Sequence, residues 1–268
     1  MPSRRVDLLP DRSRAFFVAA REPGGTRDRF VFLKGFLMPL LSRGALGRLV
    51  DFGAAVVLST LATSTGWAQG FPDKPITLYV GFAPGGSADV IARVLPDEKS
   101  KTLGQTVIVD NRSSASGNIA TSQVLQRPAD GHSLLFAGIH LATNPGVIGV
   151  PFDPKTELQM VSQVTSVPVV LLASNKSGIK SLADAMALAR KREGGLSAGS
   201  GGTATSSHLA LELMKQSTGI PAVHVPYRGG APATQDLSTG VLDLKFDMLN
   251  SGMIPLAEAR RVSPLVVM

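Results

Sequence analysis

Short hydrophobic runs of strand length alternate with amphipathic stretches of helix length after the first 70 residues. The runs are rich in β-branched and aromatic residues, and ITLYVGF at 76–82 is typical of a buried strand. The stretches between them repeat apolar residues every three or four positions, as Leu209 and Leu213 do, which is typical of helices packed on a core. This alternation predicts an α/β fold of βα units wound around mainly parallel sheets.

The predicted strands cover residues 76–82, 107–109, 133–137, 167–173, 196–198, 222–227 and 242–248. The predicted helices cover residues 88–95, 118–126, 182–192, 206–217 and 231–237. SVPVVLLAS, at 166–174, is apolar and β-branched, and it is suited to cross from one domain to the next. We therefore predict two domains, residues 69–168 and 169–268, each with a mainly parallel sheet flanked by helices.

The segment 38–68 has a different pattern. Residues 38–69 read MPLLSRGALGRLVDFGAAVVLSTLATSTGWAQ. Two arginines precede the apolar run 52–61, and small residues lead to Ala68. This order is typical of a secretory signal peptide, cleaved here after Ala68, and it predicts a periplasmic protein. A membrane anchor is the alternative, but the run is shorter than the roughly 18 residues that a span requires.

Residues 1–37 mix charged residues, Pro and Gly with short apolar pieces and keep no period. Ser3-Arg4-Arg5 weakly matches a twin-arginine signal, but Asp7 and Asp11 interrupt the region that should be apolar. We interpret 1–37 as an N-terminal extension upstream of a translation start at Met38.

Charge changes this picture little. The net charge is +7, but residues 1–68 hold ten of the 27 basic residues, and the remainder carries 17 basic against 15 acidic residues. With two Tyr, one Trp and no run of interleaved aromatic and basic residues, the chain lacks the features of a nucleic-acid surface. The absence of cysteine excludes disulfides, zinc–thiolate sites, iron–sulfur clusters and a Cys nucleophile.

Glycine-rich loops carry the candidate chemistry. The strand at 76–82 runs into APGGSAD, where Gly85 and Gly86 leave backbone N–H groups open at a predicted helix start. Such a start suits a carboxylate or phosphate, although a plain tight turn capped by Ser87 is an equal alternative. GSGGTATSSH at 199–208 repeats the arrangement, and YRGGAP at 227–232 is a third loop of the kind. Ligands of open α/β sheets bind where such loops converge, beyond the carboxyl ends of strands.

Six strings extend this pattern into a family resemblance over residues 71 to about 247. They are FPDKPITLYVGFAPGGSADVIAR, LGQTVIVDNR, GNIATSQVLQRPADGHSLLFAG, NP followed by PFDP, TSSHLALELMK and HVPYRGGAPATQDLSTGVLDLKFD. In this order the chain resembles the Bug-type extracytoplasmic solute receptors of tripartite tricarboxylate transporters. The resemblance implies a two-domain, periplasmic-binding-protein-like fold that closes on a small carboxylate, performs no catalysis, uses no cofactor or metal, and delivers its ligand to membrane permease subunits.

The resemblance also implies that backbone and hydroxyl groups of the loops hold the anion. The residues carried over by motif position are Ala83, Gly85, Gly86, Ser87, Asp89, Ser200, Gly202, Thr203, Thr205, Ser206, Tyr227 and Asp247.

Several positions depart from the family pattern. Ala204 stands where a glycine is usual, SSASG at 113–117 replaces a run usually written PGAGG, and Pro96 interrupts the first helix, which we expect to end early or kink. The family continues past the position of Met268 with a segment that returns to the first domain. We therefore expect a C-terminally truncated chain with an incomplete first domain and impaired folding or binding.

Other kinds of site fit the sequence less well. Gly199-x-Gly201-x-x-Ala204 fits a dinucleotide fingerprint, so the alternative function is a Rossmann-like oxidoreductase, but the acidic residue expected after the next strand is missing. A hydrolase with Ser200 as nucleophile and His208 or His224 as base is a weaker alternative. The four histidines show no spacing typical of a metal site.

Overall fold

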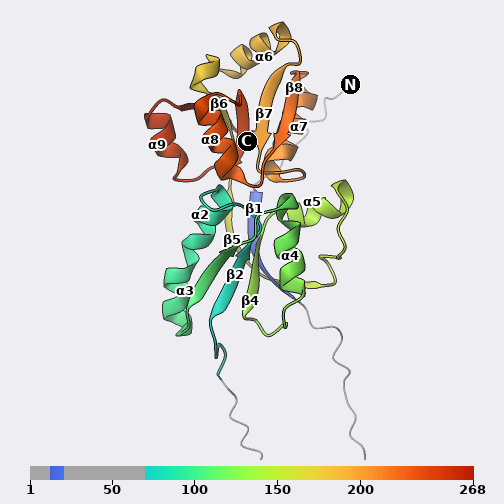
Figure 1. Cartoon of the computed structure of the whole chain (residues 1–268), viewed down its shortest axis with the longest axis vertical. Helices are drawn as coiled ribbons and strands as arrows, with labels where there is room; N and C mark the ends of the chain where they lie inside the picture. Colours follow the sequence, from blue (N-terminus) through green and yellow to red (C-terminus); the bar gives the residue numbers. More distant parts are fainter. Residues whose placement is uncertain (1–12, 21–69) are drawn as a thin grey trace, which may run out of the picture. The chain divides into compact units, whose positions relative to one another are not determined.

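The computed structural model describes residues 13–20 and 70–268. Residues 13–20 and 74–268 belong to one compact unit that contains two five-stranded sheets, sheet A and sheet B. We call sheet A with its helices the N-terminal lobe and sheet B with its helices the C-terminal lobe (Figure 1). The predicted signal peptide, 38–68, lies outside the described residues.

Sheet A has the strand order β3-β2-β4-β1-β5. β2 pairs in parallel with β3 and β4, whereas β1 is antiparallel to both β4 and β5. The strands are β1 (Ser13–Ala20), β2 (Ile76–Val80), β3 (Val107–Asn111), β4 (Ser133–Ala137) and β5 (Leu158–Val167). The helices of this lobe are α2 (Ser87–Arg93), α3 (Leu95–Leu103), α4 (Asn118–Leu125) and α5 (His140–Val147).

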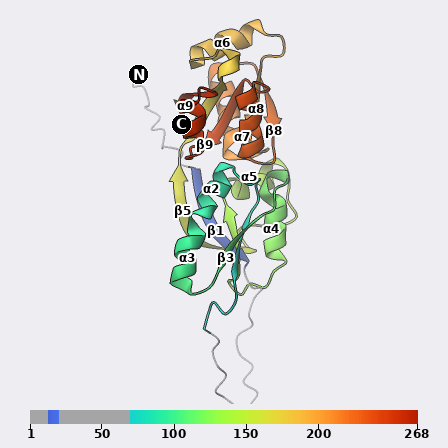
Figure 2. The same ribbon diagram turned by 60° about the vertical axis from the view of Figure 1, so that its left-hand side comes forward.

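The alternation of side chains along β2 decides which helices cover which face of sheet A. Leu78 and Val80 pack with Ala92 of α2, whereas Tyr79 packs with Val124 of α4 and Leu141 of α5. Figures 1 and 2 show α2 and α3 on one side of the sheet and α4 on the other. The N-terminal lobe is therefore a three-layer α/β/α arrangement.

β1 comes from residues 1–37, which we predicted to be an extension outside the two domains. Its backbone lies between β4 and β5, with Phe16 opposite Ala137 on one side and Gln163 on the other. Sheet A thus contains a strand that the sequence analysis did not assign to it.

Sheet B has the strand order β10-β6-β9-β7-β8. β7 pairs in parallel with β8 and β9, and β6 is antiparallel to β9 and β10. The strands are β6 (Val169–Ser174), β7 (Leu196–Ser200), β8 (Ala222–Pro226), β9 (Leu244–Met248) and β10 (Val262–Val267). The helices are α6 (Leu182–Lys191), α7 (Ser206–Thr218), α8 (Gly230–Thr239) and α9 (Met253–Glu258). The chain passes from sheet A to sheet B at Pro168, between β5 and β6.

The buried strand β6 organises the core of the C-terminal lobe. Leu171 packs with Leu211 of α7 on one face of the sheet, and Leu172 packs with Leu237 of α8 on the other. All six residues of β6 are buried, and accordingly the first five, Val169 to Ala173, are all apolar instead of alternating with polar residues.

The first helix ends early, as Pro96 predicted. α2 ends at Arg93, and α3 begins at Leu95 with the proline in its first turn, where a missing N–H leaves no helical hydrogen bond broken. α3, β5, α5 and α9 were not predicted, and β6 begins two residues later than expected because Pro168 separates it from β5. In the part of the chain that the structure describes, none of the helices has the length and apolarity to cross a membrane.

Candidate functional site

The first glycine-rich loop connects β2 to α2 and is held in place by Asp89. The Gly85 N–H donates to Asp89 Oδ2 at 2.9 Å, and Gly85 has a φ of +76°, a value that favours glycine. Arg93 Nε and Asn111 Nδ2 donate to the same carboxylate at 2.8–3.0 Å. Burial alone would raise the pKa of Asp89, but these hydrogen bonds and the charge of Arg93 outweigh it and lower that pKa. Asp89 therefore fixes the loop from behind.

The second loop connects β7 to α7 and is closed by its own hydroxyl groups. Thr205 Oγ1 donates to Gly202 O at 2.6 Å, and the Gly202 N–H donates to Ser200 Oγ at 3.1 Å. The Gly201 N–H donates to Ser207 Oγ at 3.0 Å. The Gly-Ser-Thr composition of the loop thus holds a turn at the helix start without large side chains.

Two stacked histidines support this loop from the side of α7 and β8. Ser200 Oγ lies 2.6 Å from His224 Nε2, and the Ala204 N–H donates to His208 Nδ1 at 3.0 Å. The rings of His208 and His224 stack with centroids 3.9 Å apart. Burial lowers the pKa of both, that of His224 to about 4, with the neighbouring His208 contributing to the latter. Both rings are therefore neutral at pH 7.

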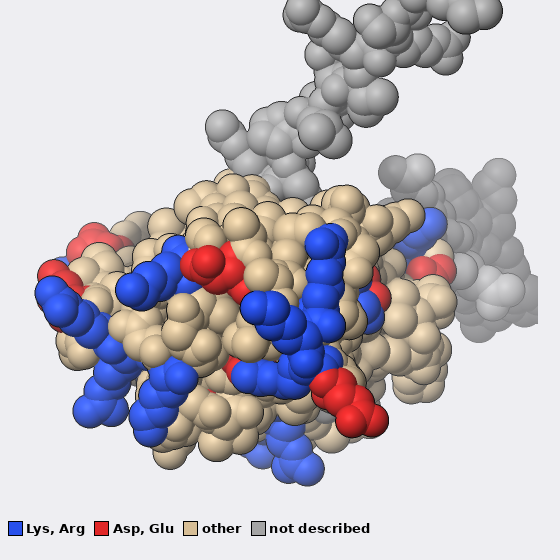
Figure 3. Space-filling view, turned by 90° about the horizontal axis from the view of Figure 1, so that it is seen from above, with Lys and Arg blue, Asp and Glu red and all other residues tan. Residues whose placement is uncertain are grey.

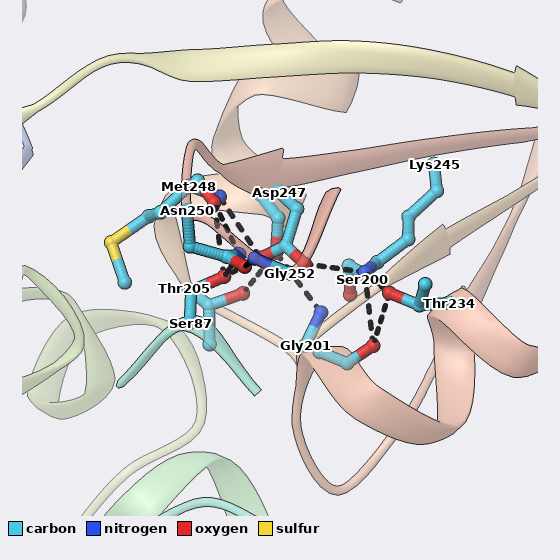
Figure 4. A network of polar contacts seen from close by, with 12 residues as sticks. Ser87, Ser200, Gly201, Thr205, Thr234, Lys245, Asp247, Met248, Asn250 and Gly252 are labelled. Atoms are coloured by element: carbon cyan, nitrogen blue, oxygen red, sulfur yellow. Dashed lines mark hydrogen bonds and ion pairs between the residues drawn. The ribbon is translucent and has the colours of Figure 1, made fainter. Parts of the chain in front are cut away.

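The two lobes meet through polar contacts between these loops and their neighbours. The Ala83 N–H donates to Arg228 O at 3.0 Å, and Thr143 Oγ1 donates to Ala204 O at 2.6 Å. Ser87 Oγ lies 2.9 Å from Asp247 Oδ1 at the end of β9, as Figure 4 shows. These contacts define a closed cleft.

Glycines allow the loops of the two lobes to approach closely. A Cβ on Gly86 would lie 3.2 Å from the Gly230 nitrogen, and a Cβ on Gly229 would lie 2.8 Å from the Ala83 nitrogen. Gly229 also has a φ of +132°, outside the range of ordinary residues. The two lobes therefore approach backbone to backbone.

A cavity of about 630 Å³, its open mouth included, lies in this cleft. It is lined by Phe82, Gly86, Ser87, Ala88, Phe136, Ala137, Gly138, Ile139, His140, Gly201, Thr205, Ser206, Ser207, Gly230, Asp247 and Met248. The first residues of α5, α7 and α8 are all among these, and in the described structure no N-cap side chain bonds to the start of any of the three helices.

The cavity contains little side-chain charge. Asp247 is the one acidic residue among the described lining residues, and no Lys or Arg is among them. His140, which is buried, has its pKa lowered by burial to about 4 and is neutral at pH 7. On the face seen in Figure 3, lysines and arginines lie among uncharged and acidic residues. An anion in the cavity would therefore meet main-chain N–H groups and hydroxyls instead of cationic side chains.

The structure places the twelve predicted site residues in two groups. Gly86, Ser87, Thr205, Ser206 and Asp247 line the cavity. The residues that support the loops or lie beside the cavity are Ala83, Gly85, Asp89, Ser200, Gly202, Thr203 and Tyr227. Tyr227 donates to Asp236 Oδ2 at 2.5 Å, and burial together with this bond raises its pKa to about 12. Sequence reasoning missed the wall formed by Phe82, Phe136, Ile139, His140 and Met248.

The alternative sites find limited support in the geometry. Ser200 does lie against His224, but its side chain is fully buried and absent from the cavity lining, so a substrate cannot reach it there. Within residues 13–20 and 70–268, no three His, Cys, Asp or Glu side chains are grouped to hold a metal ion.

Two α/β/α lobes with a cleft lined by helix starts define the class of periplasmic-binding-protein-like proteins. The comparison with protein families narrows this class: residues 91–259 match the tripartite tricarboxylate transporter family receptor. The chain belongs to this receptor family, whose members bind solutes and are not enzymes.

Individual relatives agree with this assignment. A protein of Pseudomonas sp. strain P51, encoded in the tcbD–tcbE intergenic region, is 35% identical over 205 residues, which are 76% of this chain and 61% of the relative. Protein BugT of Bordetella pertussis is 35% identical over 181 residues, 65% of this chain and 55% of BugT. The chain thus spans about three fifths of the length of the relatives that it matches.

Solved structures show the same fold. An R. palustris protein with adipate is 36% identical with a TM-score of 0.69, over 74% of this chain and 66% of that one. MatC from Rhodopseudomonas palustris, with bound malate, is 28% identical with a TM-score of 0.67, over 74% and 67% of the two chains. A periplasmic transporter of known structure is 35% identical with a TM-score of 0.70, over 74% of this chain and 66% of that one.

Proposed function

We propose that this protein captures a small carboxylate in the cleft and delivers it to the membrane permease subunits of a tripartite transporter. Membership of the receptor family supports this proposal, as do the adipate and malate that two relatives hold. The proposal includes export to the periplasm, with residues 38–68 as a signal peptide cleaved after Ala68.

The convergence of helix starts carries the proposal. The N–H groups in the first turn of a helix have no intrahelical partner, and the helix dipole gives that end a partial positive charge. α7 and α8 begin at one cavity, where the Ser206 hydroxyl adds a donor, and α5 also begins there, although the N–H groups of Leu141 and Ala142 already donate to the preceding turn. A carboxylate satisfies such a set of donors without any cationic side chain.

The cavity lining also contains apolar side chains, which indicate what kind of group the anion is attached to. Phe82, Phe136, Ile139 and Met248 line it together with alanines. This wall favours a ligand with a carbon chain, such as a short dicarboxylate, over a phosphate or another fully polar anion. The ligand-binding roles of all twelve predicted residues, whether in the lining or in the loops behind it, belong to this proposal.

Calorimetric titration of the full chain with adipate and with malate tests the proposal. We expect saturable binding of at least one of them and a higher melting temperature in its presence. Stabilisation by a nicotinamide nucleotide, or hydrolysis of an ester substrate that is lost on Ser200→Ala, would instead support one of the alternative functions.

Ser206→Ala and Ser217→Ala form a matched pair for this titration, because both remove a hydroxyl from α7. Ser206 lines the cavity, whereas Ser217 is exposed near the end of the helix. We expect Ser206→Ala to weaken binding about tenfold, in line with the loss of one hydrogen bond to a charged group, and Ser217→Ala to leave it unchanged.

A further inference from the structure

A lysine is buried directly behind the cavity. Lys245, in β9, is 0% exposed, and its Nζ donates to Gly230 O at 2.9 Å, to Thr234 Oγ1 and to Asp247 Oδ2. An ammonium group has three N–H donors, so these three acceptors use all of them. Figure 4 shows Lys245 and Thr234 on the far side of Asp247 from Ser87.

Both carboxylate oxygens of Asp247 therefore have hydrogen-bond partners within the protein. Its Oδ2 accepts from Lys245, and its Oδ1 accepts from the Met248 N–H at 2.9 Å and faces Ser87 Oγ at 2.9 Å. The absence of a side chain on Gly230 allows this packing, since a Cβ there would lie 2.7 Å from Asp247 Oδ2. Thus the acidic group that reaches the cavity already has an ammonium partner within the protein.

Without Lys245, the negative charge of Asp247 would determine which ligands the cavity accepts. A carboxylate facing a partly enclosed cavity repels an anionic ligand and attracts an ammonium group on the ligand, and both effects are strong where water is excluded. Lys245 balances this charge from behind and occupies the oxygen that a ligand ammonium would need. The wall of the cavity is thereby kept neutral.

We propose that Lys245 is a specificity-determining residue: as the internal counter-ion of Asp247, it makes the cavity select carboxylates without an amino group over α-amino acids of the same length. This inference rests on the proposed function and names the class of ligand for the same site. It assigns to a residue outside the cavity lining a control over what the cavity accepts.

A matched pair of ligands measures this selectivity directly. Adipate and 2-aminoadipate differ by one ammonium group, and succinate and aspartate form a shorter pair. The affinities of the full chain for all four are measured by calorimetry in the wild type and in Lys245→Met, which removes the charge and keeps a long apolar side chain. Lys99→Met, at an exposed position of α3, controls for the change in net charge.

In the wild type we expect the simple dicarboxylate of one pair to bind at least tenfold more tightly than its amino counterpart. Lys245→Met should lower this ratio of affinities at least tenfold. Without the lysine, Asp247 repels the simple dicarboxylate and attracts the ammonium group of its amino counterpart. Adding Asp247→Asn to Lys245→Met should restore the ratio, and Lys99→Met should not move it. A role of the ion pair in folding alone predicts a lower melting temperature with the same ratio, so that result would overturn the inference.

Asp247→Asn alone gives a second test that keeps Lys245. An unpaired ammonium now lies behind the cavity, so the ratio in favour of the simple dicarboxylate should rise. If Lys245→Met does not fold, this variant decides, and an unchanged or lower ratio refutes the inference. Wild-type binding of a dicarboxylate without selectivity also refutes it but leaves the proposed function intact, whereas no binding of any carboxylate removes both.

Discussion

Acidification should loosen the second glycine-rich loop through the stacked histidines. His208 Nδ1 accepts the Ala204 N–H, and His224 Nε2 lies 2.6 Å from Ser200 Oγ, while the rings are 3.9 Å apart. Protonation of His208 at Nδ1 breaks the first hydrogen bond, and two imidazolium rings at this separation repel each other. The charged groups near the pair, Glu212 and Lys215, act in opposite directions on both pKa values.

The size of the effect follows from the pKa of His224, which burial lowers to about 4. In the unfolded chain a histidine has a pKa of about 6.5, so between these values the unfolded chain binds a proton that the native state does not. The free energy of unfolding therefore falls as the pH drops from about 6.5 to about 4 and levels off below. The difference between these two pKa values corresponds to about 3 kcal/mol of unfolding free energy. Because His224 is half-buried, solvent screens part of this effect, and we expect a loss of about 2 kcal/mol.

Urea unfolding at about pH 7 and about pH 4.5 measures this loss. Wild type should lose about 2 kcal/mol more than His224→Gln, which cannot take up the proton but keeps an amide near Ser200. Buried His140, whose pKa is also lowered to about 4, adds a loss that is common to both proteins. Equal pH dependence in the two proteins, or an NMR titration of His224 near its unperturbed pKa, would refute the reasoning.

Three further substitutions have defined outcomes. Gly229→Ala should weaken ligand affinity at least tenfold in calorimetry, because its Cβ would lie 2.8 Å from the Ala83 nitrogen; unchanged affinity would contradict the closed cleft. Ala204→Gly should raise the free energy of unfolding by about 1 kcal/mol in urea, since Ala204 has a φ of +61°; a decrease would show that no strain is present. Asp243→Asn should lower it by about 2 kcal/mol, because Asp243 accepts two bonds of 2.7 Å from Arg192, while ligand affinity, measured as a control, stays the same.

The sequence predicted the elements whose formation depends on local pattern. β2 and β4 are short apolar runs bounded by turn residues, and α6 and α7 have an apolar stripe, so burial of one side is enough to define them. α5 was missed because HLATNPGV contains Pro145 and Gly146 inside the helix. β5 was missed because six of its ten residues are exposed and its apolar residues do not alternate with polar ones, and because its partner β1 lies some 140 residues earlier in the chain.

The candidate site divides in the same way. The loops were predictable because glycines and hydroxyl residues between a strand and a helix have a local structural meaning. The apolar wall of the cavity was not predictable from the sequence. Phe136 lies near the end of β4, Ile139 at the start of α5 and Met248 at the end of β9, and only the order of the strands brings them to one cavity. The ligand-binding role of Asp89 stays a prediction, and the contacts of its carboxylate with Gly85, Arg93 and Asn111 could not be predicted from the sequence, because they depend on how β3 lies beside the loop.

This division indicates where selectivity is encoded. Main-chain N–H groups at the starts of α7 and α8 offer similar donors to any carboxylate, so substitutions in the loops should change how tightly a ligand is held more than which ligand is chosen. The choice then depends on the apolar wall, which favours a carbon chain, and on Asp247 with Lys245, which sets the charge next to it. Relatives could therefore share the loops and differ in their ligands through a few buried positions on β4 and β9.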